Sequence, residues 1–156
     1  MWLSLTCNLH QFRTVLNKGA WRLIYYIDFM NKAIRTFFLW AYAIFYVLAG
    51  CNHFLSTAVY YVIMPKWLPV PGFLIYFSGI IEIVLGLLLL FAKTRKLAAL
   101  LIILMLIAFL PAHIYMIQMA PFILGKILVT PFIAWARLPF QLLFIGWAWY
   151  YYKKTV

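Results

Sequence analysis

The chain has 156 residues, of which 69% are hydrophobic and only 10% are charged, whereas soluble domains average about 25% charged residues. A water-surrounded core cannot hide this much apolar side chain, so the composition excludes an ordinary soluble domain. The net charge of +11 comes from short basic clusters between apolar runs. This pattern argues against a nucleic-acid partner and favours a role of charge in membrane topology.

The N-terminal residues 1–29 are predicted to be an extension that precedes a membrane domain of residues 30–156. They lack the apolar core and cleavage site of a secretory signal. Met30 is followed at once by a basic segment and the first long apolar run. One hypothesis is that natural translation starts at Met30, and the alternative is a real interfacial helix around residues 21–29.

Four apolar runs follow, each long enough to cross a bilayer, which takes about 20 residues of helix. They cover residues 37–55, 73–91, 97–117 and 132–152. Backbone polar groups find no water in lipid, and the runs lack strand-like alternation, so they are predicted to be helices. The predicted fold class is all-α, an integral membrane four-helix bundle surrounded by the lipid bilayer.

Basic residues indicate how these spans are oriented. The N-terminal flank, the turn at residues 92–96 and the C-terminal tail carry most of the Lys and Arg residues, whereas the other loops carry only Lys66 and Lys126. The positive-inside rule then predicts a multi-pass membrane protein with both termini cytoplasmic. The two outer loops, 56–72 and 119–131, are rich in proline or apolar residues and are predicted to lie along the outer interface.

Polar side chains inside the spans are the candidate functional residues, because an ionisable group at mid-membrane costs at least ~2.5–3.5 kcal/mol. Glu82 is the only anion inside a span and Arg137 the only cation. A helical rise of about 1.5 Å per residue places the candidates in the outer half of the bundle. The predicted polar site consists of His53, Glu82, His113, Arg137 and Gln141.

Helical spacing refines the site. Glu82 shares a face with two glycines, at positions 79 and 86, that allow a neighbouring helix to approach. Arg137 and Gln141 are four residues apart and share a face of the last span. Pro111 is expected to free a carbonyl near Ile107 for a polar neighbour.

Two interpretations of the polar site remain open. In one, Glu82 and Arg137 form a structural clamp, bridged by Gln141. In the other, the group lines an outward-opening pocket for a ligand head group, walled by Tyr46, Trp67 and Tyr76. Haem or metal bound by the histidines has little support, since thiolate and carboxylate partners are scarce. Cys7 and Cys51 are too far apart in sequence for a redox motif, and we recognise no catalytic motif or metal site.

Six segments in order resemble the DoxX-like family of small bacterial four-helix membrane proteins. They are AGCNHF (49–54), YYVIMPKWLPVPG (60–72), SGIIEIVLGLLLL (78–90), KTRK (93–96), FLPAHIYM (109–116) and RLPFQ (137–141). The family often has Asn at the position of His113. The resemblance covers residues 30–152 and implies functional positions at His53, Pro65, Pro69, Gly79, Glu82, Pro111, Arg137 and Gln141.

The resemblance implies an accessory component of a quinone-linked redox or envelope process, because the founding member is a membrane subunit linked to quinone-dependent sulfur oxidation. Quinone is then a possible ligand and a membrane redox protein a possible partner. The alternative is a structural or chaperone-like partner of another membrane protein, with no ligand of its own. In that case the small-residue face of the second span would serve assembly.

Overall fold

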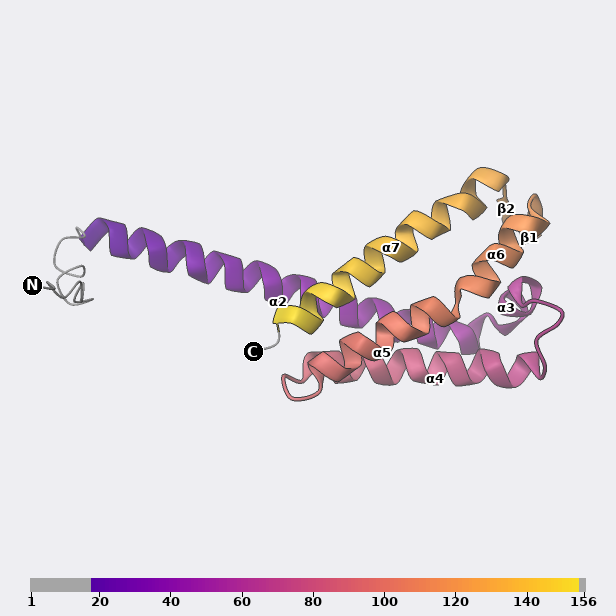
Figure 1. Cartoon of the computed structure of the whole chain (residues 1–156), viewed down its shortest axis with the longest axis horizontal. Coiled ribbons are helices and arrows are strands. Elements are labelled where there is room, and N and C mark those ends of the chain that lie inside the picture. Colours follow the sequence, from indigo (N-terminus) through magenta and orange to yellow (C-terminus); the bar gives the residue numbers. More distant parts are fainter. Residues whose placement is uncertain (1–17, 155–156) are drawn as a thin grey trace, which may run out of the picture. The chain divides into compact units, whose positions relative to one another are not determined.

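The computed structural model describes residues 18–154 and their side chains from residue 23 (Figure 1). Helices dominate this part of the chain, as predicted. The elements are α2 (Lys18–Leu55), α3 (Thr57–Ile63), α4 (Pro71–Leu90), α5 (Arg95–Ala108), α6 (Leu110–Met119), β1 (Phe122–Leu124), β2 (Ile127–Val129) and α7 (Pro131–Lys154). The chain divides into two units, residues 1–38 and residues 39–156, and the candidate site lies within the second.

Helix α2 is much longer than the run predicted at 37–55. It begins at Lys18 and ends at Leu55, so its end was predicted correctly and its start was wrong. From residue 20 to residue 49 the sequence contains no Gly or Pro, so nothing stops the helix in that stretch. Residues 21–29 are helical and α2 continues through Met30. The hypothesis that translation starts there stays a prediction.

The turn between α4 and α5 satisfies the end of α4 with side chains. Arg95 donates from Nε to the Leu89 carbonyl at 3.0 Å and from Nη2 to the Leu90 carbonyl at 3.1 Å. Thr94 Oγ1 donates to the Leu88 carbonyl at 2.7 Å. The last carbonyls of a helix have no partner within the helix, and a cation there also complements the helix dipole. The basic turn therefore stabilises the α4–α5 hairpin as well as carrying charge.

The run predicted at 97–117 is two helices rather than one. Helix α5 ends at Ala108, α6 begins at Leu110, and the N–H of Phe109 bonds to the carbonyls of Met105 and Leu106 at 3.1 Å each. Pro111 causes the break because it has no N–H to donate to the preceding turn. The two pieces are close enough to a single helix that residues 95–119 still form one candidate membrane span.

The two predicted outer loops contain regular structure. Residues 56–72 include α3, and Pro71 starts α4 at a position where a missing N–H costs nothing. Residues 119–131 contain an antiparallel hairpin in which Phe122 pairs with Val129 and Leu124 with Ile127. Gly125, with a φ of 63°, forms the tight turn between its strands. The all-α prediction therefore missed one small two-stranded sheet.

Three helical stretches of the described chain are long and apolar enough to cross a membrane: Leu23–Leu55, Pro71–Leu90 and Arg95–Met119. Helix α7 covers the fourth predicted run and is long enough to cross a bilayer, and Pro139 lies inside it. Its many Trp and Tyr residues, together with Arg137 and Gln141, make it less apolar than the others. Its crossing of the membrane stays a prediction.

The main core of the second unit draws on four helices. Buried residues of α2, α4, α5 and α7 form one cluster, which includes Tyr42, Leu89, Ile102 and Ala148. The fully buried Tyr42 donates its hydroxyl hydrogen to the Phe144 carbonyl at 2.7 Å and thereby ties α2 to α7. A buried hydroxyl needs such a partner, because leaving it unbonded costs about 1–3 kcal/mol.

Helices α2 and α4 touch through glycines. A Cβ added to Gly50 would lie 2.5 Å from the carbonyl oxygen of Gly79, and one on Gly79 would lie 2.7 Å from the Cβ of His53. A Cβ on Gly86 would meet the Ala43 carbonyl at 2.8 Å. These distances leave no room for a methyl group, so the two backbones are in direct contact. The predicted close approach at the small-residue face is confirmed, and the partner is α2 of the same chain.

We expect Gly50→Ala to lower the free energy of unfolding by about 1–3 kcal/mol, because the added methyl group must separate two backbones. The matched control is Gly146→Ala in α7, where an added Cβ meets nothing within 4 Å. That change should be neutral or slightly stabilising, since Ala favours helix over Gly. Unfolding of both variants by SDS titration from detergent micelles measures the difference. Equal effects at the two positions would contradict the close packing of α2 on α4.

We expect Arg95→Met to destabilise the protein by about 1–2 kcal/mol, because two helix-terminal carbonyls lose a charged donor. Lys93→Met is the control, since it removes the same charge from an exposed neighbour in the same turn. The same unfolding titration applies. If the two variants lose equal stability, charge alone matters and the capping bonds do not.

Candidate functional site

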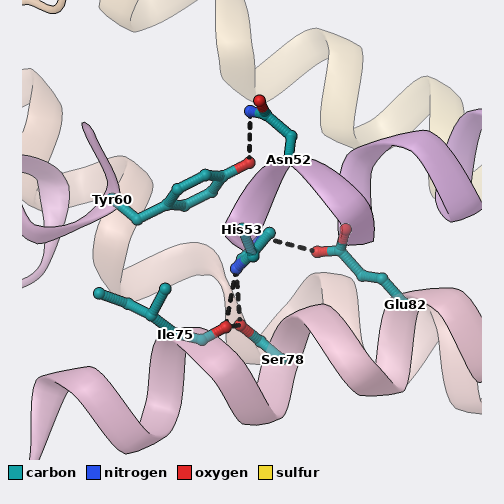
Figure 2. A network of polar contacts seen from close by, with 6 residues as sticks. All are labelled: Asn52, His53, Tyr60, Ile75, Ser78 and Glu82. Atoms are coloured by element: carbon teal, nitrogen blue, oxygen red, sulfur yellow. Dashed lines mark hydrogen bonds and ion pairs between the residues drawn. The ribbon is translucent and has the colours of Figure 1, made fainter. Parts of the chain in front are cut away.

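His53 is the centre of a polar network between α2 and α4 (Figure 2). Its Nδ1 lies 2.9 Å from the Ile75 carbonyl and 3.2 Å from Ser78 Oγ. Its Nε2 lies 3.4 Å from Oε1 of Glu82. Both His53 and Glu82 are buried. The close glycine contact between the two helices brings this imidazole and this carboxylate together.

The contact between His53 and Glu82 is oriented from the other side of the imidazole ring. A carbonyl oxygen can only accept, so Nδ1 of His53 carries the hydrogen that goes to Ile75. This bond leaves Nε2 of the ring facing Oε1 of Glu82. The 3.4 Å separation is long for a charge-assisted bond, so Glu82 is held loosely.

Three further polar residues, which the sequence analysis did not assign to the site, support this network. Ser78 donates to the Ile75 carbonyl at 2.9 Å and lies one helical turn before Glu82, a spacing that could have revealed it. Tyr60 of α3 packs its ring 3.8 Å from that of His53. Asn52 donates to the Tyr60 hydroxyl at 3.0 Å. Burial raises the pKa of Tyr60, the bond from Asn52 lowers it, and the charge of Glu82 raises it further.

Gln141 joins three helices. Its Oε1 accepts a hydrogen bond from Nδ1 of His113 at 2.7 Å, and its Nε2 donates to the Leu106 carbonyl. A carbonyl near Ile107, that of Leu106, therefore has the expected polar neighbour, and it also accepts from the N–H of Phe109. Gln141 is buried, and it fixes the position of His113 instead of contacting a ligand itself.

A cavity of about 880 Å³ brings most of the predicted site residues together. His53, Glu82, His113 and Arg137 line it, and Gln141 does not. The predicted aromatic wall was wrong in its members, since Tyr46, Trp67 and Tyr76 lie outside the lining. The aromatic lining residues are Tyr60, Phe77 and Phe109. The sequence placed the polar residues at one level but could not show which aromatic rings turn toward them.

The expected ion pair between Glu82 and Arg137 is not formed. Within residues 18–154, the basic side chain that contacts Glu82 is His53 of α2, the helix that packs against α4 through the glycines. Oε2 of Glu82 and Nε of Arg137 are both buried and lack a hydrogen-bond partner among the described residues. The two residues nevertheless line the same cavity. Glu82 therefore has an acceptor without a partner, and Arg137 has a donor without a partner.

Among the described residues, no three His, Cys, Asp or Glu side chains come together in a way that could hold a metal ion. The chemistry available at the cavity is therefore described by its own groups. These are a carboxyl group and an imidazole 3.4 Å apart, a second imidazole fixed by Gln141, and a guanidinium. Such groups can bind, orient and exchange protons with a polar molecule.

Comparison with known proteins gives one match. The chain matches no curated protein and no solved structure. A family model described as Domain of unknown function (DUF8561) matches residues 42–152, which include the cavity and the core of the second unit. The chain therefore belongs to the DUF8561 family.

Proposed function

We propose that this chain is a small multi-pass protein of the bacterial inner membrane, a four-helix bundle similar to the DoxX-like family, with both termini in the cytoplasm. It binds the polar head of a membrane-soluble ligand of the quinone class in the outer half of the bundle. It acts as an accessory component of a quinone-linked redox or envelope process.

The observation that carries this proposal is the pair of unmatched polar atoms at the cavity. Glu82 is only 4% exposed, and its Oε2 has no partner. A buried acceptor without a partner costs about 1–3 kcal/mol, and more when it is charged. Nε of Arg137, a donor, carries a similar cost. A ligand that offers one donor and one acceptor removes both costs at once.

A quinol head has this combination of groups, whereas the oxidised quinone offers acceptors only. A hydroquinone hydroxyl can donate to Oε2 of Glu82, and a ring oxygen can accept from Nε–H of Arg137. Tyr60 and Phe109 offer apolar faces to the ring.

The membrane setting rests on apolar length and on charge. Three helical stretches are long and apolar enough to cross, and many of their large apolar side chains are exposed. Exposed apolar surface on this scale is rare in soluble monomers. The basic residues gather beside the α4–α5 turn and at both ends of the chain, which supports the proposed orientation.

The structural or chaperone-like alternative receives less support. It relied on the small-residue face of α4 as a docking surface for another membrane protein. Gly79 and Gly86 on that face are already packed against α2 of the same chain. A foreign helix would have to displace α2, and with it His53.

We expect Glu82→Gln to weaken the binding of a decyl-substituted hydroquinone by about tenfold or more, because a neutral amide replaces the carboxyl acceptor that the hydroquinone hydroxyl contacts. Binding of the tritiated compound to protein in lipid nanodiscs measures the effect, with empty nanodiscs as the blank. Gln has nearly the shape of Glu, so the cavity volume is preserved.

The control is Asp28→Asn, which neutralises the only other acid of the chain at an exposed position outside the cavity. It should bind the compound as the wild type does. Equal binding by the wild type and Glu82→Gln, or no binding by either, would count against a ligand site at Glu82.

A further inference from the structure

One end of the cavity is wholly apolar. From Glu82 toward the α4–α5 turn, the lining residues on α4 are Val84, Leu85 and Leu88, and those on α5 are Leu101, Leu104 and Met105. The polar lining residues lie at Glu82 or toward α3. Six residues from Glu82 to Leu88 correspond to about 9 Å of helix. The cavity therefore has a polar part and an apolar groove along one axis.

The groove is open at its side. Val84 and Leu104 line it and are nevertheless 45% and 53% exposed, so they form the rim of an opening between α4 and α5. In a bilayer, that rim faces hydrocarbon chains rather than water.

We propose that the ligand carries a hydrocarbon tail, enters sideways from the bilayer between α4 and α5, and lays the tail in the groove of residues 84–88 and 101–105. This proposal rests on the proposed function, because the polar head at Glu82 fixes which end of the ligand lies where. A hydrocarbon tail offers no hydrogen bond to Glu82, and a polar head gains nothing from apolar contact with the leucines. The lining therefore places the head of the ligand at Glu82 and its tail in the groove.

The occupant is a single-tailed amphiphile rather than a helix of another protein. The unmatched Oε2 of Glu82, in a nearly fully buried side chain, requires a small polar group at the end of the groove. From Glu82 to Leu88 the groove extends about 9 Å along α4, a length that suits one short hydrocarbon chain.

The test uses a hydroquinone head with a hexyl tail that ends in a diazirine, bound to the protein in nanodiscs and irradiated. Peptide mapping by mass spectrometry should find the label on residues 84–88 or 101–105. The same head without a tail, in tritiated form, reports head binding separately.

Two neighbouring leucines give a matched pair of variants. Leu101 and Leu100 are 37% and 36% exposed on the same helix, but only Leu101 lines the cavity. Leu101→Trp should cut labelling of the groove by about fivefold, because the indole fills the far end. Leu100→Trp should leave it within about twofold, and neither variant should change binding of the tail-less head.

Label spread evenly over exposed residues such as Leu142 and Leu143, or equal losses in the two variants, would overturn the tail site. The proposed function would still stand if the tail-less head bound in a Glu82-dependent way. If neither compound bound, the proposed function would fail and this inference with it.

Discussion

The direct contact between the backbones of α2 and α4 is the constraint on which the site depends. Gly50 and Gly79 meet with no space for a methyl group. His53 lies three residues after Gly50, and Glu82 three residues after Gly79. Both side chains flank this contact, and the imidazole and the carboxyl group face each other at 3.4 Å. A wider helix separation would leave each group buried without the other.

The choice of partner for Glu82 shows what a single sequence can and cannot determine. Residue type and depth identified the ionisable groups of the site, and helical spacing placed Glu82 on the glycine face. Arg137, the only cation inside a predicted span, was expected to be its partner, but the contact at 3.4 Å is with His53. The rotation of α2 and α7 about their axes determines which side chain reaches Glu82, and that rotation comes from packing across helices far apart in sequence. Four of the five predicted residues line one cavity, whereas the predicted pairing of Glu82 with Arg137 was wrong.

The fold shows the same division between local and non-local information. Three of the four predicted runs contain helices close to the expected bounds, since about twenty apolar residues in a row leave few other options. The early start of α2 was missed because apolarity marks where a helix can cross a membrane, not where it begins. The hairpin at residues 122–129 was missed because its strands have three residues each, too few for alternation to be visible. Pro111 indicated a disturbance of the third predicted run, but the sequence did not predict that the run divides into two helices at Phe109.

The side opening of the cavity has a consequence for the resting state of the protein. A void of about 880 Å³ with an apolar rim does not stay vacant next to fluid hydrocarbon. In the proposed membrane setting, acyl chains of ordinary phospholipids occupy the cavity until the proposed ligand displaces them. Binding is then an exchange of one chain for another, in which the apolar portion gains little and the polar head supplies the selectivity. Measured affinity should accordingly vary with the chain length and saturation of the surrounding lipid.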